Sequence, residues 1–315
     1  MTIKLLAVAL AAVAAFTGVA ASAGAFGTAA AEVTSDPNRL YADSKLIARD
    51  RISVEVIGTG PDVIFVPGLS SSRTTWKRTA ERLRSRYRLH IVQVAGFSGE
   101  PSGPNATGEV VIPTAEAIDA YIVSAKLAPV AYVGHSLGGT MGLYLAERHP
   151  EHLKKVLLVD SLPFYGVIMG GPAATAETIK PTADATKAGI LKGTPEQAAA
   201  SLKQTASFMA KSAEGGAEIT SAGGRSDRAV VATAMAEDMT LDLRPNLAAV
   251  TPPITLIYPF DAAMGMPEAM WDRLYKGQFA PLKTAKLVRV DDSRHFVMFD
   301  QPAKFDAALD AFLAQ

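Results

Sequence analysis

Short β-branched segments alternate with amphipathic segments from about residue 40 to the C-terminus. The apolar segments are residues 52–57, 63–66, 89–94, 130–133, 156–159, 254–258 and 287–290. Apolar residues at helical spacing lie between or after them, as in Trp76, Ala80, Leu83 and in Phe305, Leu309, Phe312. Mostly apolar strands that alternate with helices form a parallel sheet covered on both faces. The sequence therefore predicts an α/β fold with a mainly parallel central sheet flanked by helices.

Residues 164–245 break this alternation. They contain no convincing strand, are rich in Ala, Thr, Gly and Lys, and have helical patterns near residues 195–211 and 227–237. A structureless loop of this length is improbable inside a compact domain. We interpret the interval as an inserted helical cap, with a disordered insert as the alternative. The predicted organisation is a core of residues 40–163 and 246–315, interrupted by a cap at 164–245.

The N-terminal 31 residues have a different character. Lys4 is followed by an apolar stretch, and no further charge occurs before Glu32. Small residues such as Ala21-Ser22-Ala23 form a signal-peptidase site. Residues 1–31 are therefore predicted to be a signal peptide and short leader, with the mature chain beginning between Gly24 and Glu32 in the periplasm or outside the cell. The alternative is an uncleaved anchor, but an Ala- and Gly-rich stretch inserts weakly.

Composition excludes several kinds of site. The 31 basic and 31 acidic side chains give a formal charge of +0, so no nucleic-acid surface is expected. The absence of cysteine excludes disulfides, thiolate catalysis and cysteine metal sites. His149 and His152 flank Pro150, which favours a solvated helix end. The sequence thus predicts no metal and no cofactor, and a small molecule as the partner.

The stretch "YVGHSLGG", residues 132–139, constrains the chemistry most. It joins a buried strand to an amphipathic helix, so Ser136 occupies a sharp turn where positive φ is costly for a residue with a side chain. Gly134 and Gly138 relieve crowding there, and Gly139 lets the helix approach the sheet. This is the pattern of a nucleophile elbow, G-x-S-x-G. The alternative is a glycine-rich helix start that Ser136 merely caps.

A serine nucleophile needs a base and a group that orients the base. His295 lies after the last strand, at the carboxyl edge where ligands meet open α/β sheets. The favoured orienting acid is Asp261, which follows the strand "ITLIY" in the expected chain order. Asp160, after "KVLLV", is the rival, whereas Asp291 and Asp292 are too near the histidine in the chain.

Acyl transfer also needs two backbone N–H groups that face the developing oxyanion. One is predicted to come from Leu137, directly after the nucleophile. The other is predicted to come from Leu69, because Gly68 allows the chain to bend after the strand at residues 63–66. Ser70–Ser72 are interpreted as turn and helix-capping residues.

The stretches "VPGLSSSRTTW", "AGFSGEPSG", "VGHSLGG", "YPFD" and "RHFVMFDQP" resemble the α/β-hydrolase superfamily, from about Ile52 to the C-terminus. Pro67-Gly68 replaces the usual His-Gly, and Ala95 stands where relatives often have Asp. The resemblance implies hydrolysis of an ester or related acyl bond through an acyl-enzyme. The alternative is a binding protein that kept the fold without the activity.

The predicted cap is expected to lie over Ser136 and to select a small, mostly apolar, uncharged substrate. Its apolar side chains include flexible thioethers, which suit an adaptable wall. These residues are Met169, Phe208, Met209, Met235 and Met239.

Overall fold

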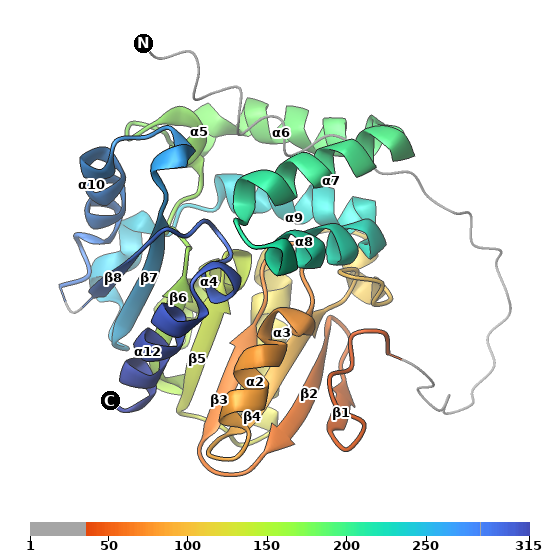
Figure 1. Cartoon of the computed structure of the whole chain (residues 1–315), viewed down its shortest axis with the longest axis vertical. Helices are drawn as coiled ribbons and strands as arrows, with labels where there is room; N and C mark the ends of the chain where they lie inside the picture. Colours follow the sequence, from red (N-terminus) through yellow and green to blue (C-terminus); the bar gives the residue numbers. More distant parts are fainter. Residues whose placement is uncertain (1–35, 284) are drawn as a thin grey trace, which may run out of the picture.

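A computed structural model describes residues 36–283 and 285–315, so the predicted signal peptide lies outside the described residues. Eight strands form one sheet in the order β1-β2-β4-β3-β5-β6-β7-β8 (Figure 1). The strands are β1 (Lys45–Ala48), β2 (Ile52–Gly58), β3 (Asp62–Val66), β4 (Arg88–Val94), β5 (Val130–His135), β6 (Leu153–Val159), β7 (Ile254–Phe260) and β8 (Lys286–Asp291). Within the described ranges, no helix combines the length and apolar character needed to cross a bilayer.

The sheet is parallel from β4 to β8, whereas β2 pairs antiparallel with both β1 and β4. The prediction of a mainly parallel sheet is therefore confirmed, and all seven predicted strands are present. Strand β1 was not predicted, because it is only four residues long, at the edge of the sheet, and its residues are exposed or half-buried. Since β5 to β8 are parallel neighbours, their carboxyl ends meet at one edge of the sheet.

Helices cover both faces of the sheet. On one face, Trp76 stacks on Phe305 and contacts the tilted ring of Phe65, with ring centroids 6.2 and 5.3 Å away. The helices of this face are α2 (Lys77–Leu83) and α12 (Pro302–Leu313), which follow the 3-10 helix η1 (Arg73–Trp76) and the short helix α11 (Val297–Asp300), respectively. The opposite face carries α3 (Val111–Ser124), α4 (Leu137–Arg148) and α10 (Glu268–Phe279).

Residues 164–245, all of them described, contain helices and no strand. Figure 1 shows these helices grouped above the sheet. They are α5 (Gly166–Gly170), α6 (Ala176–Lys192), α7 (Pro195–Met209), α8 (Ala213–Arg225) and α9 (Arg228–Thr240). The sequence pattern indicated α7 and α9 but not α6, which contains Pro181, or α8, which contains two Gly-Gly pairs. Proline and glycine are poor helix formers, so packing of α6 on α9 and of α8 on α7 must override local preference.

Acidic side chains fasten the cap to the core. Glu218 in α8 accepts a hydrogen bond from the Ser72 hydroxyl at 3.0 Å. Glu237 in α9 accepts from the backbone N–H groups of Val110 and Val111 at 3.0 and 2.7 Å, which caps the start of α3. These contacts hold two cap helices at defined positions over the carboxyl edge of the sheet.

A buried arginine joins the first described residues to the core. Arg73 is fully buried, and its Nη1 lies 2.7 Å from Asp36 Oδ2 and 3.7 Å from Glu55 Oε2. Glu55, also fully buried, accepts from the backbone N–H groups of Leu40 and Tyr41 at 2.8 and 2.9 Å. A buried charge is tolerated when it is paired and hydrogen-bonded, as here. The segment from Asp36 onward is therefore part of the folded core.

Candidate active site

Ser136 sits at a strained turn between β5 and α4. Its backbone has φ 52° and ψ −123°, a conformation that costs free energy for a residue with a side chain. The Ser136 N–H donates to the Val159 carbonyl at 2.9 Å, and its carbonyl accepts from the N–H groups of Gly139 and Thr140. The elbow is thus fixed to β6 on one side and to α4 on the other. The half-buried Ser136 lines a cavity.

The three glycines of the elbow prevent three different collisions. A Cβ on Gly134 would lie 2.3 Å from the Gly138 carbonyl oxygen, which is the crowding that the sequence predicted. A Cβ on Gly138 would instead meet the Val66 carbonyl oxygen at 2.5 Å, and one on Gly139 would meet Ser161 at 2.6 Å. The elbow therefore packs directly against the loops that follow β3 and β6.

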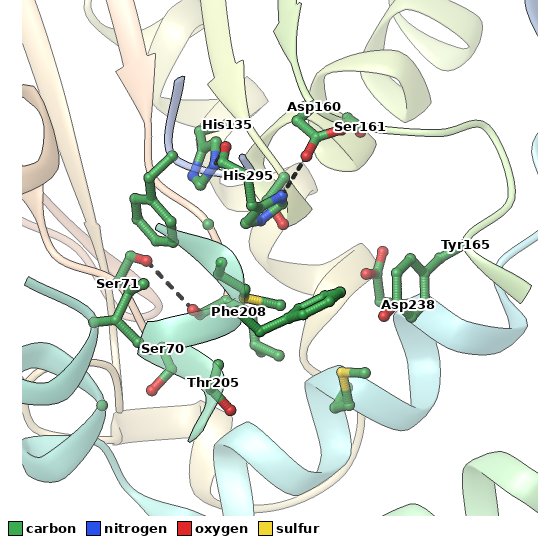
Figure 2. Close-up of a pocket in the computed structure, with 18 of the residues that line it drawn as sticks. Ser70, Ser71, His135, Asp160, Ser161, Tyr165, Thr205, Phe208, Asp238 and His295 are labelled. Atoms are coloured by element: carbon green, nitrogen blue, oxygen red, sulfur yellow. Dashed lines mark hydrogen bonds and ion pairs between the residues drawn. The ribbon is translucent and has the colours of Figure 1, made fainter. Parts of the chain in front are cut away.

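His295 is held by Asp160. The Nδ1 atom of His295 lies 2.6 Å from Oδ2 of Asp160 (Figure 2), and the Tyr275 hydroxyl donates to the other carboxylate oxygen. Asp160 directly follows β6, whereas His295 lies in the loop between β8 and α11. Because an ionised carboxylate only accepts, Nδ1 carries a proton, and when the ring is neutral Nε2 can accept one. Such a ring can take a proton from a hydroxyl.

The sequence-based preference for Asp261 as the partner of His295 is wrong. Asp261 Oδ2 lies 3.0 Å from Arg294 Nε and 3.3 Å from Lys211 Nζ, and Oδ1 accepts from the Ala263 N–H. Burial raises the pKa of Asp261, but these hydrogen bonds outweigh burial and lower it. Asp261 and Asp160 end neighbouring strands, so both reach this edge. The guanidinium beside His295 in the chain binds Asp261, which leaves Asp160, the rival, for the imidazole.

His135 supports the loop that carries His295. The fully buried His135 donates from Nε2 to the His295 carbonyl oxygen at 3.1 Å, and the two rings are 4.5 Å apart. Burial, and then the charge of His295, lower the pKa of His135 well below its usual value. His135 is therefore a neutral positioning group. No role for His135 was predicted, because it fills an unconstrained position of the elbow pattern.

The loop after β3 lies against the elbow. A Cβ on Gly68 would be only 3.0 Å from Cβ of Ser136, so glycine allows this close approach. Within the described part of the chain, the backbone N–H groups of Leu69 and Leu137 donate to no other residue. Both residues adjoin the elbow: Leu69 lines the cavity, and Leu137 directly follows Ser136 in the chain. Ser72 caps η1, in agreement with its predicted role.

Core and cap line a cavity of about 250 Å³, and both Ser136 and His295 contribute to its wall. Figure 2 shows His295 among the lining residues. The cap side is largely apolar, with contributions from Ile190, Leu202, Phe208, Met209, Ile219, Val231 and Met235. Three of the five predicted wall residues, Phe208, Met209 and Met235, thus line the cavity. Met169 and Met239 instead pack against the core.

Asp238 in α9 is an acidic exception in this wall. Only 8% of the residue is exposed, and Oδ1 has no hydrogen-bond partner among residues 36–283 and 285–315. Burial raises its pKa to about 6, although a hydrogen bond from Thr140 and the charge of His295 oppose this rise. Asp238 was not predicted from the sequence. It lies three residues after Met235 on the same helix face, and this spacing could have indicated that it lines the cavity.

Replacing Asp238 by asparagine should stabilise the fold at alkaline pH. The pKa of the Asp238 carboxyl is about 6 in the folded protein and 3.8 in the unfolded chain. The folded protein therefore loses stability as pH rises between these two values. The variant should therefore be about 3 kcal/mol more stable than the parent at pH 8, and the difference should halve near pH 5. Urea unfolding of both proteins at the two pH values measures it. An equal difference at both would contradict this titration.

His149 and His152 lie near the carboxylate of Asp119, and none of these three residues lines the cavity. Their ring nitrogens and an Asp119 oxygen all lie within 4.8 Å of one another. His152 Nδ1 is already 2.8 Å from Asp119, and His149 Nε2 is 3.0 Å from Glu116. These hydrogen bonds account for the cluster without an ion, and the absence of a metal stays a prediction.

Comparisons agree with this architecture. Two curated proteins named pimeloyl-[acyl-carrier protein] methyl ester esterase, from Chromobacterium violaceum and Aeromonas hydrophila, are each 33% identical over 110 and 115 residues. These matches span 35% and 36% of this chain and only 41% and 43% of the relatives.

Solved structures match over a larger part of the chain. A hydrolase from Pseudomonas aeruginosa PA01 has a TM-score of 0.71 at 16% identity, covering 87% of this chain and 99% of that one. A thermophilic esterase from Thermogutta terrifontis has a TM-score of 0.66 at 18% identity, covering 87% and 98%. A sequence profile described as the alpha/beta hydrolase family matches residues 63–308. With the elbow and the sheet described above, the chain belongs to the alpha/beta hydrolase family.

Proposed function

We propose that this protein is a serine hydrolase that cleaves an ester of a small, mostly apolar substrate through an acyl-enzyme. Ser136 is the nucleophile, His295 the general base, and Asp160 the group that orients and charge-stabilises the histidine. The N–H groups of Leu69 and Leu137 form the oxyanion hole. One observation carries the proposal: a strained serine and a carboxylate-bound histidine share one enclosed cavity.

The proposed reaction follows from this arrangement. Nε2 of His295 takes the hydroxyl proton as Ser136 Oγ attacks the ester carbonyl, and the negative oxygen accepts from the two N–H groups. The tetrahedral adduct collapses, the C–O bond to the alcohol breaks, and His295 returns the proton to the leaving alcohol. Water then attacks the acyl-enzyme by the same route. Asp160 stays ionised throughout and stabilises the imidazolium.

Several observations favour esters among acyl substrates. The curated relatives are named as methyl ester esterases, and one structural neighbour is an esterase. The cavity wall is apolar on the cap side, which suits the chain of an uncharged ester. Dehalogenases and epoxide hydrolases of this fold would need an aspartate at the elbow, where this chain has Ser136.

A fluorophosphonate probe distinguishes this proposal from a binding protein that only kept the fold. The probe should attach to Ser136, identified by mass spectrometry of the labelled peptide, and should leave a Ser136→Ala variant unlabelled. Failure to label the folded parent protein would favour the non-catalytic alternative.

We also propose that the protein is exported to the periplasm or beyond the cell. The supporting feature is the leader of residues 1–31, with its early Lys4 and its A-x-A site. Cell fractionation and N-terminal sequencing of the mature protein test this. An intact Met1 on membrane-bound protein would favour the retained anchor.

The cap wall should set the preferred acyl chain length. Each methylene buried there contributes about 0.8 kcal/mol, so kcat/KM should rise about fourfold per CH₂ until the cavity is full. Phe208→Ala should move the optimum to longer chains, because Phe208 points into the cavity (Figure 2). Met169→Ala, outside the cavity, is the matched control. The measurement is kcat/KM for p-nitrophenyl esters from acetate through octanoate. If both variants show the same dependence of kcat/KM on acyl chain length, the cap does not select the substrate.

A further inference from the structure

The cavity contains one acid that the proposed reaction does not use. Asp160 serves His295 and Asp261 binds two cations, whereas Asp238 stands in the cap wall formed by α9. Figure 2 shows Asp238 beside Tyr165, on the opposite side of the cavity from Ser70. Its position places it where the substrate chain, rather than the reacting bond, would lie.

Asp238 has an unmet requirement for a hydrogen-bond donor. Thr140 is close enough to lower the pKa of Asp238, but no described residue donates a hydrogen bond to Oδ1. The side chain is more than nine-tenths buried and no salt bridge forms on it within the described ranges. A buried carboxylate without enough donors is destabilising, so it persists where a ligand supplies the missing one. Tyr165 is close enough for the charge of Asp238 to raise the pKa of its hydroxyl, after the larger effect of burial.

We propose that Asp238 determines specificity by binding a hydrogen-bond donor, a hydroxyl or a protonated amine, on the chain of the substrate. The inference rests on the proposed esterase function and narrows it. The substrate is then apolar along most of its length but carries one donor that reaches Oδ1. A purely alkyl chain of the same size leaves that oxygen buried and unpaired.

The expected effect is a preference between matched substrates. Hydrogen bonds to a charged group are stronger than neutral ones, and a site built for a donor rejects the analogue that lacks it. Replacing a terminal methyl by a hydroxyl at the right distance should therefore raise kcat/KM about 10-fold or more. In an apolar pocket without Asp238, the same replacement would lower kcat/KM, because the buried hydroxyl would lose its hydrogen bonds to water without gaining a partner.

The test uses pairs of methyl esters in which a terminal hydroxyl replaces a terminal methyl. Methyl 4-hydroxybutanoate, 6-hydroxyhexanoate and 8-hydroxyoctanoate are each compared with the alkyl ester one carbon longer. A second pair, 4-hydroxybutyl and pentyl butanoate, places the donor on the alcohol side. At least one pair should favour the hydroxyl in the parent protein, and Asp238→Leu should abolish or reverse that preference. Met169→Leu, a cap substitution outside the cavity, is the control and should keep it.

The charge of the donor is resolved by a second variant. Asp238→Asn keeps an acceptor oxygen, so it should retain part of the hydroxyl preference but lose preference for methyl 6-aminohexanoate at pH 8. The Asp238→Asn variant also tests the inference if Asp238→Leu does not fold. Equal kcat/KM within every pair for the parent protein, or a preference that survives Asp238→Leu, would overturn the inference. Hydrolysis of methyl heptanoate by the parent but not by Ser136→Ala tests the underlying function separately.

Discussion

Ser136→Ala should lower kcat for p-nitrophenyl acetate by about 10⁴-fold or more while the protein stays folded. No other group in the elbow can form the acyl-enzyme, so the residual rate comes from the oxyanion donors alone. Alanine adopts the positive φ of this position no less readily than serine, because both carry a single unbranched Cβ.

The fold of this variant is checked by its thermal midpoint and circular dichroism, both of which should match the parent. Turnover near the parent value in the purified variant would remove Ser136 from the reaction. Loss of activity together with loss of structure would instead assign Ser136 a folding role.

Asp160→Asn should lower kcat by about 10⁴-fold, the second-largest effect that we expect. An asparagine amide can donate to Nδ1, which would favour the ring tautomer with its proton on Nε2 and block proton transfer from Ser136. The Tyr275 hydroxyl can still donate to the amide oxygen, so the local structure should persist. The measurement is kcat over a pH series, with KM expected to change much less.

Asp261→Asn is the matched control, since it makes the same chemical change at the end of the neighbouring strand. It should reduce kcat by less than about 10-fold, because Asp261 binds Arg294 and Lys211 rather than the imidazole. A larger loss in this variant than in Asp160→Asn would reverse the assignment and restore the order favoured by the sequence.

The sequence predicted what depends on local patterns. Apolar strands, amphipathic helices and the glycine spacing around Ser136 each carry a period or a steric requirement that short segments reveal. The position of His295 followed from its place after the last strand. These features predicted the fold, which is confirmed, and two members of the proposed triad.

Contacts between distant segments could not be predicted in the same way. Asp160 and Asp261 were equivalent as strand-end acids, and the choice between them depended on where the Arg294 and Lys211 side chains point. His135 and Asp238 acquired their environments only when the loop after β8 and the cap folded over the sheet. A sequence-level reading can propose such residues, but side-chain competition decides among them.

The buried guanidinium of Arg73 sets a limit on how far the N-terminus can be shortened without loss of stability. A cut between Gly24 and Glu32 leaves Asp36 attached, and the ion pair survives. A cut beyond Asp36 would strip one counter-charge from a cation with no access to water, at a cost of roughly 3–5 kcal/mol. Arg73 begins the turn that follows the Leu69 loop, so loss of Asp36 would destabilise a loop that lines the cavity. The length of the N-terminal segment and the stability of a loop beside the cavity are therefore linked through one side chain.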